Sequence, residues 1–147
     1  MTDTALTRRR SENSHQKTWH IYFGDVHVGT IGTRAGVPKD VDQWGWHLGF
    51  YPGTEPGAHQ SGSAETYPAA RDEFERAWLQ LEPTLTEENY EAWRRSRDWH
   101  AWKYRIWGNG CRMPTQNSSG WSTCFCGEQI PIACETHIYS AHRGIGA

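Results

Sequence analysis

Two short stretches in which apolar and polar residues alternate stand near the start of the chain, at residues 19–23 and 26–31. The dipeptide Gly24-Asp25 separates them, and alternation on both sides of a two-residue turn is typical of a β-hairpin. Pairing across such a turn predicts one core face made of three cross-strand pairs. These pairs are Phe23 with Val26, Ile21 with Val28, and Trp19 with Thr30.

A third alternating stretch covers residues 43–51 and predicts another strand. It places four large apolar side chains on one face: Trp44, Trp46, Leu48 and Phe50. The segments on either side have no such pattern. Residues 52–63 are rich in Pro, Gly and Ser and predict a loop, and residues 1–17 are polar without periodicity and predict a disordered arm.

From Thr66 onward the spacing of apolar residues changes to that of a helix. The apolar stripe consists of Ala70, Phe74, Ala77, Trp78 and Leu81. One helix face is therefore expected to cover the tryptophan-rich face of the sheet. The segment Thr84-Leu85-Thr86-Glu87 matches a capping box, which predicts a second helix that runs to about Trp107 and stops at the Gly-Asn-Gly of residues 108–110.

The second predicted helix carries two apolar stripes rather than one. One stripe contains Tyr90, Trp93, Ala101 and Tyr104, and the other contains Trp99, Trp102 and Ile106. A helix with two apolar stripes is expected to pack on two partners. One partner is the sheet with the first helix, and the other is either the C-terminal segment or another molecule.

These elements predict an α+β fold with a three-stranded antiparallel sheet covered by a helix, a second long aromatic helix and a short Cys/His-rich tail. The expected boundaries are a disordered arm at 1–17, an α+β domain at 18–110 and the tail at 111–147. The hairpin, the Trp44-Gly45-Trp46 strand and the amphipathic helix together resemble a β-β-β-α module of short bacterial proteins, and more loosely the layout of HicB-type antitoxins. That resemblance covers about half of the chain, implies an interaction role and brings no functional residues with it.

Composition narrows the class of protein further. The chain has 147 residues, of which 36% are hydrophobic, and its nine Trp supply much of the burial that one core needs. The formal net charge of −2 provides no overall attraction to nucleic acid or to a membrane surface, so any such contact has to be local. With neither a long apolar run nor the apolar middle of a signal peptide, the sequence favours a cytoplasmic protein whose four cysteines are thiols or metal ligands.

Two cysteines and two histidines near the end of the chain have the residue types of a zinc site: Cys124, Cys126, His137 and His142. Their order is similar to that of a Cys2His2 zinc finger, in which two thiolates and two imidazoles form a tetrahedron. The pattern departs from that class in two ways, because one residue separates the cysteines and only ten lie between Cys126 and His137. Ile130 and Ile132 are expected to form a small core beneath the metal.

Other assignments of these residues stay open. Cys134 is an alternative third sulfur ligand, and Cys111 is a more distant one. The competing interpretation is that Cys126 and Cys134 are small buried thiols and that the histidines lie on the surface. If zinc binds, four protein ligands imply a closed structural site, since catalytic zinc keeps a position open for water.

A second group of histidines follows from the hairpin register. His20, His27 and His47 are expected to project from the sheet face opposite the core. Together they would suit a metal-dependent enzyme. The simpler interpretation is a solvated sheet face that happens to contain histidines.

Basic and aromatic side chains are interleaved along the second helix. The cations are Arg94, Arg95, Arg97, Lys103, Arg105 and Arg112, and the rings include Trp93, Trp99, Trp102 and Tyr104. Such a pattern suits single-stranded nucleic acid, but also a buried aromatic stripe whose cations pair with Glu91 or Asp98.

No phosphate-binding, nucleophile or metalloprotease motif is present in the sequence. The leading hypothesis is therefore a small non-catalytic interaction or regulatory protein that binds another protein through exposed aromatic surface. The expected anchors are Trp99, Trp102 and Arg95. The alternatives are a nucleic-acid-binding regulator that uses the Arg/Trp-rich helix and a metal-dependent enzyme that uses the histidine group.

Overall fold

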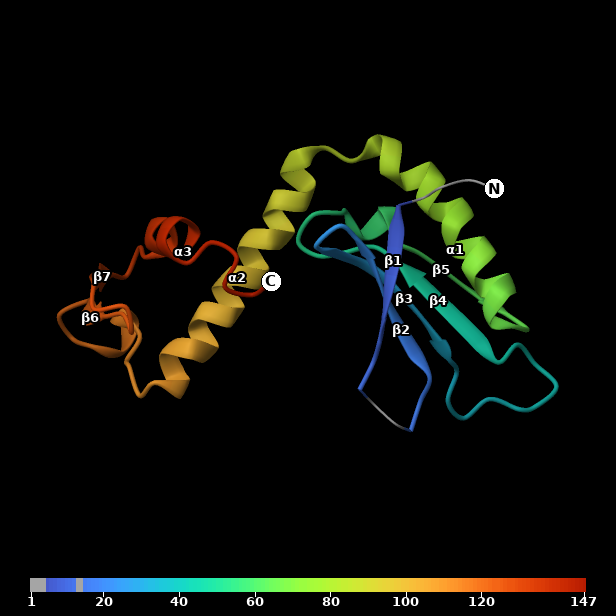
Figure 1. The fold of residues 1–147 in the computed structure, drawn as a ribbon, viewed down its shortest axis with the longest axis horizontal. Coiled ribbons are helices and arrows are strands. Elements are labelled where there is room, and N and C mark those ends of the chain that lie inside the picture. The colour runs from blue at the N-terminus through green and yellow to red at the C-terminus, as the bar shows by residue number, and fades with distance from the viewer. Residues whose placement is uncertain (1–4, 13–14) are drawn as a thin grey trace. The chain divides into compact units, whose positions relative to one another are not determined.

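The computed structural model describes residues 5–12 and 15–147 (Figure 1). The chain forms two compact units, a first unit of Met1–Trp93 and a second unit of Arg94–Ala147. The division lies within the second long helix, earlier in the chain than the expected boundary between residues 110 and 111. The second half of that helix belongs with the Cys/His-rich tail because it supplies part of the tail's core.

The first unit contains a five-stranded antiparallel sheet in the order β1-β2-β3-β4-β5. The strands are β1 Leu6–Arg10, β2 Thr18–Phe23, β3 Val26–Thr33, β4 Trp44–Leu48 and β5 Gln60–Ala64. The α+β class and the three central strands agree with the prediction from sequence.

The two edge strands were not predicted. β1 lies in the segment expected to be a disordered arm, of which residues 1–4 and 13–14 fall outside the described residues, and β5 lies in the segment expected to be a loop. Both expectations are wrong for the strand residues. Their sequences, LTRRR and QSGSA, carry no apolar alternation, because edge strands that are mostly exposed are held by backbone pairing rather than by burial.

A β-bulge changes the predicted register of the β2–β3 hairpin. Phe23 pairs with Val26 as predicted, but the register shifts between Ile21 and Tyr22, so that Ile21 pairs with Gly29. Trp19 then pairs with Ile31 instead of Thr30. The extra residue in β3 moves Ile31 into the core, where it is fully buried, and the predicted place of Thr30 in the core face is wrong.

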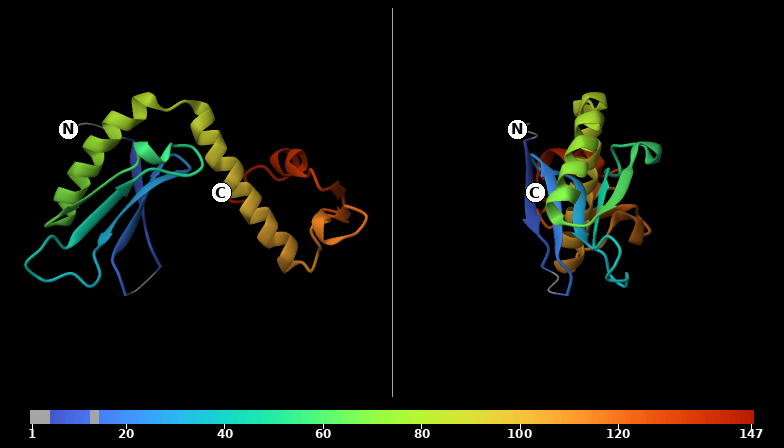
Figure 2. Two further views of the ribbon diagram at one scale, coloured as in Figure 1. Left: turned by 180° about the vertical axis from the view of Figure 1, so that it is seen from behind. Right: turned by 90° about the vertical axis from the view of Figure 1, so that its right-hand side faces the viewer.

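Helix α1, Tyr67–Leu81, covers one face of the sheet (Figures 1 and 2). The Thr66 hydroxyl caps it by accepting a hydrogen bond from the Ala69 N–H at 3.3 Å. The five residues of the predicted stripe are all buried: Ala70, Phe74, Ala77, Trp78 and Leu81. The helix packs so closely that a Cβ on Gly29 would lie 2.6 Å from the Phe74 ring.

The helix α2, Glu87–Gly108, follows a short 3-10 turn, Glu82–Thr84. Its start differs in detail from the predicted capping box. Asn89 accepts hydrogen bonds from the Thr86 backbone N–H and hydroxyl, whereas the Thr84 hydroxyl donates to the Leu81 carbonyl of the preceding helix. The cap is therefore formed two residues later than the Thr84–Glu87 pattern indicated, although the helix ends as predicted.

The second unit packs a small ββα arrangement on the later part of α2. Its elements are the 3-10 turn Pro114–Gln116, strands β6 Trp121–Thr123 and β7 Gln129–Pro131, and helix α3 Glu135–Ala141. The buried core comprises Trp102, Ile106, Cys124, Ile130, Cys134 and Ile138. Ile130 has its predicted core position, whereas Ile132 is 58% exposed and does not belong to this core. No helix among the described residues is both long and apolar enough to span a membrane.

Candidate metal centre

The two cysteines of the predicted zinc site occupy the turn between β6 and β7. The Cys124 N–H donates to the Glu128 carbonyl, and the Gly127 N–H donates to the Cys124 carbonyl, both at 2.8 Å. Gly127 has a φ of +92°, a conformation that L side chains rarely adopt. This tight turn brings two thiols only one residue apart to the same end of the hairpin.

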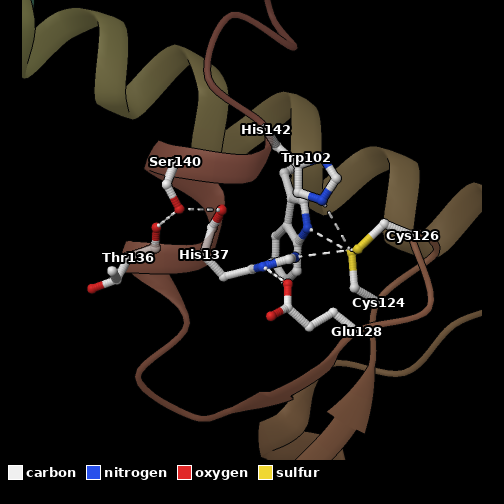
Figure 3. Close-up of polar contacts among 8 residues, drawn as sticks. All are labelled: Trp102, Cys124, Cys126, Glu128, Thr136, His137, Ser140 and His142. Atoms are coloured by element: carbon white, nitrogen blue, oxygen red, sulfur yellow. Dashed lines mark hydrogen bonds and ion pairs between the residues drawn. The ribbon is translucent and has the colours of Figure 1, made fainter.

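Helix α3 supplies the two histidines. His137 lies within the helix, and His142 follows its last residue and donates its backbone N–H to the Ile138 carbonyl. The Cys124 Sγ and His142 Nε2 atoms are 3.4 Å apart, and the Cys126 Sγ and His137 Nε2 atoms are 3.6 Å apart. Figure 3 shows the thiols and the imidazoles pointing toward one another.

One ligand atom from each of the four residues lies within 4.8 Å of all the others. The predicted set of Cys124, Cys126, His137 and His142 is thus assembled in three dimensions and can hold a metal ion. Cys124 is buried, the histidines are half-buried and Cys126 is exposed. The short spacings that depart from the zinc-finger pattern are accommodated because the cysteine pair sits directly in a hairpin turn.

Two further side chains orient the group, and the sequence did not indicate either. A Glu128 carboxylate oxygen lies 2.8 Å from His137 Nδ1, which leaves Nε2 of that ring facing Cys126. The Trp102 indole N–H donates to the Cys124 sulfur at 3.4 Å. Carboxylates that fix the tautomer of a ligating histidine are a recurrent feature of metal sites.

The surroundings of His142 and Cys126 favour the uncharged form of these two side chains. Burial lowers the pKa of His142, and the neighbouring His137 and Arg105 lower it further. The Glu128 backbone hydrogen bond acts to lower the pKa of Cys126, but burial and the adjacent Cys124 together leave that pKa raised. A bound cation would therefore displace a proton from the Cys126 thiol.

The alternative cysteines lie outside this group. Cys134 is 4% exposed and packs in the core of the second unit, where burial and then Glu135 raise the pKa of its thiol. Cys111 is half-buried and its sulfur lies 4.0 Å from the Asn109 carbonyl oxygen. Neither belongs to a group of potential ligands in the described part of the chain.

The histidines of the sheet do not form the metal site considered from the sequence. His20 and His47 both pair with Thr30, which lies on the strand between them, so the two histidines are separated by two strand spacings of about 4.8 Å each. The His20 and His27 rings are 5.0 Å apart, and burial, then His20, lowers the pKa of His27. Across residues 5–12 and 15–147 the Cys2His2 group is the only cluster of three or more potential ligands.

The three expected interface anchors differ in their exposure. Trp102 is fully buried in the core of the second unit, so the expectation that it forms exposed surface is wrong. Trp99 is half-buried beneath the Lys103 ammonium, and Arg95 is exposed with its guanidinium 5.8 Å from the Tyr139 ring. The indole N–H of Trp102 donates to the Cys124 sulfur, so that this polar group has a partner within the core.

The exposed rings of the second unit are instead Tyr104, Trp107 and Trp121. The sequence analysis placed Tyr104 in an apolar stripe and Trp107 at the helix end. On a helical wheel, both rings lie on the face opposite Trp102 and Ile106.

Two of the basic residues that the sequence analysis noted along this helix have partners in the second unit. Arg97 pairs with Asp98 at 3.1 Å, and the Arg105 guanidinium lies 5.2 Å from the centre of the Phe125 ring.

The chain matches no protein-family model, no curated protein and no solved structure. Function is therefore inferred from the geometry and chemistry of the sites.

Proposed function

We propose that the Cys2His2 group binds one structural zinc ion and that this ion stabilises the fold of the second unit. Zn–S bonds of about 2.3 Å and Zn–N bonds of about 2.05 Å at a tetrahedral angle require sulfur and nitrogen ligands about 3.5 Å apart. The two Sγ–Nε2 distances of 3.4 and 3.6 Å match that spacing. This match is the observation that carries the proposal.

The donor set also favours zinc and a structural role. Two thiolates and two imidazoles in a tetrahedron are typical of zinc sites rather than of calcium or magnesium sites, which use oxygen ligands. Four protein ligands leave no coordination position for a substrate or an activated water. The zinc therefore contributes folding free energy, and the unit it stabilises is a non-catalytic binding module.

The binding surface of this module is the exposed aromatic part of α2. Tyr104 is 73% exposed and Trp107 is 81% exposed. An aromatic side chain can bury roughly 150–250 Å² in a contact, so these two rings offer a large area to a binding partner. Large exposed aromatic rings are common anchors of binding sites. We therefore assign the protein to the non-catalytic interaction proteins. Tyr104 and Trp107 take the role of interface anchors that the sequence analysis gave to Trp102, which is buried.

Metal analysis of the purified full-length chain tests the zinc site. We expect about one zinc per chain, and loss of that zinc together with thermal stability in Cys124→Ser and in His137→Ala, because three remaining ligands bind a structural ion poorly. Mass spectrometry of the eluted metals identifies the ion, and differential scanning calorimetry reports stability.

Cys111→Ser and His100→Ala are the matched controls, since both positions carry the same residue types outside the ligand group. They should retain the zinc of the wild-type protein. Zinc retained by Cys124→Ser and by His137→Ala, or a wild-type chain that binds no zinc after refolding with it, would refute the proposal.

A further inference from the structure

One exposed face of α2 combines aromatic rings with basic groups. His100, Lys103, Tyr104 and Trp107 stand three and four residues apart, so they lie on the same side of the helix, and we refer to them as the aromatic face. All four are exposed. The Lys103 ammonium lies 5.0 Å from the centre of the Trp99 ring, which positions this cation beside the face.

The aromatic face continues into two neighbouring hollows. One, of about 400 Å³, is lined by the face itself and by the residues that follow α2, including Cys111 and Met113. The other, of about 540 Å³, is lined by Arg112 and by Trp121, which is 51% exposed. Cys111 lines both hollows. We refer to the exposed rings and cations along the two hollows, Lys103, Tyr104, Trp107, Arg112 and Trp121, as the band.

The charge of the second unit differs in sign from that of the whole chain. Residues 94–147 contain seven Lys and Arg against three Asp and Glu, a formal net charge of +4, whereas residues 1–93 contain eight against fourteen, a net charge of −6. Two of the three acidic side chains are engaged in the fold, since Asp98 accepts backbone N–H groups and Glu128 contacts His137. The net charge of −2 for the whole chain is therefore the sum of a basic second unit and an acidic first unit.

We propose that this band binds single-stranded nucleic acid, with bases stacked on Tyr104, Trp107 and Trp121 and phosphates beside Lys103 and Arg112. The proposal names the partner of the non-catalytic module described above and rests on that module. Exposed rings next to cations are the arrangement with which proteins bind single strands without reading their sequence. A duplex keeps its base faces stacked inside and offers the rings nothing to contact.

A partner protein fits the band less well. Of the four large hydrophobic side chains exposed on the second unit, three are aromatic and only Ile132 is aliphatic. The Tyr104 and Trp107 rings line one of the hollows and are still 73% and 81% exposed, so that their faces are accessible, and the charge of +4 complements a polyanion. Stacking needs free ring faces, whereas a protein groove needs contiguous apolar area.

Fluorescence anisotropy of a labelled oligothymidylate of about 20 nucleotides, titrated with the zinc-loaded full chain, tests the proposal. We expect saturable binding that weakens with salt, and weaker binding of a duplex of the same length. Trp107→Ala and Tyr104→Ala should each reduce affinity by about 5- to 150-fold, the range that follows from the loss of one stacked base. Lys103→Ala and Arg112→Ala should each reduce the slope of log K against log salt by about 0.7.

Tyr51→Ala is the matched control, because this tyrosine is 79% exposed and belongs to the first unit. It should bind the oligothymidylate as the wild type does. Zinc content and thermal stability are measured for every variant, so that a failure of the zinc site is distinguished from a failure of the surface.

Three results would overturn the assignment. The first is a zinc-loaded wild-type chain that does not bind the oligothymidylate, and the second is binding that survives Trp107→Ala with Tyr104→Ala. The third is equal binding of polyglutamate with equal sensitivity to those substitutions, which would assign the band to an acidic protein instead.

Discussion

Glu128 lies at the edge of the Cys2His2 group without being part of it. Its carboxylate is 2.8 Å from His137 Nδ1, so that this nitrogen faces the carboxylate and Nε2 faces Cys126. The residue is exposed, and its own contribution to fold stability through this contact is small. Its effect is therefore expected mainly in metal affinity.

We expect Glu128→Ala to weaken zinc binding by about 10- to 100-fold, the usual effect of removing a carboxylate that orients a ligating histidine. Glu128→Gln should have an intermediate effect, because the amide oxygen can still accept the Nδ1–H but lacks the charge. Competition with a chromophoric zinc chelator measures the affinities. Glu135→Gln, an exposed acid at the start of α3, is the control, and equal affinities for Glu128→Ala and the wild type would exclude the role.

At the scale of the elements, Asp98 connects α2 to the segment after α3. This carboxylate is 3% exposed and accepts the Gly144 N–H at 2.9 Å and the Gly146 N–H at 3.1 Å. Gly146 packs so tightly that a Cβ would lie 2.7 Å from the Arg97 side chain. The segment of residues 144–146 is thus bound to α2 by the buried Asp98 carboxylate. Ile145, within this segment, packs against the core of the second unit.

Asp98→Ala should lower the free energy of unfolding by about 1–3 kcal/mol, because it leaves two backbone N–H groups without their acceptor. Asp98→Asn should cost less, since its amide keeps one oxygen acceptor. Urea unfolding of the zinc-loaded protein measures both. Glu55→Ala, at an exposed position in the first unit where the side chain makes no capping hydrogen bond, serves as the reference, and an Asp98→Ala chain as stable as Glu55→Ala would contradict the prediction.

At the scale of the whole molecule, the two units differ in what stabilises them. Among the described residues, thirteen form the hydrophobic core of the first unit between the sheet and α1, whereas six form that of the second unit, of which two are cysteines. A core that small supplies little hydrophobic stabilisation, and small folds commonly depend on a metal or a disulfide. The four cysteines form no disulfide, so zinc is the expected stabilising element.

Removal of the metal should therefore affect one unit selectively. In hydrogen-exchange mass spectrometry, we expect a zinc chelator to increase exchange of the amides in β6, β7 and α3, while β2, β3 and β4 keep their protection. Cys124→Ser should show the chelated pattern without chelator and should not respond further. Increased exchange spread equally over both units would show that the metal does not act on the second unit alone.

The spacing of apolar and polar residues along the chain was sufficient to predict the strands and the helix in which that spacing is regular. The hairpin turn at Gly24-Asp25, the strand around Trp46 and the five-residue stripe of α1 were predicted because alternation and helical spacing report directly which side of an element is buried. The Cys2His2 ligand set was predicted for a similar reason. Ligand chemistry depends on residue type, and the order of Cys124, Cys126, His137 and His142 is similar to that of a Cys2His2 finger, whereas Cys134 stayed an alternative until the structure placed it in the core.

Tertiary structure decided what depends on residues distant in the sequence. The edge strands β1 and β5 exist because neighbouring strands offer backbone partners, and the bulge that brings Ile31 into the core is a property of the pair of strands. Trp102 and Tyr104 are both aromatic side chains with one polar group, and they lie two residues apart in the sequence. Trp102 is nevertheless buried, whereas Tyr104 is 73% exposed. Only the packing of the ββα segment on one side of α2 separates them, because a helix with two apolar stripes does not itself specify which stripe its partner covers.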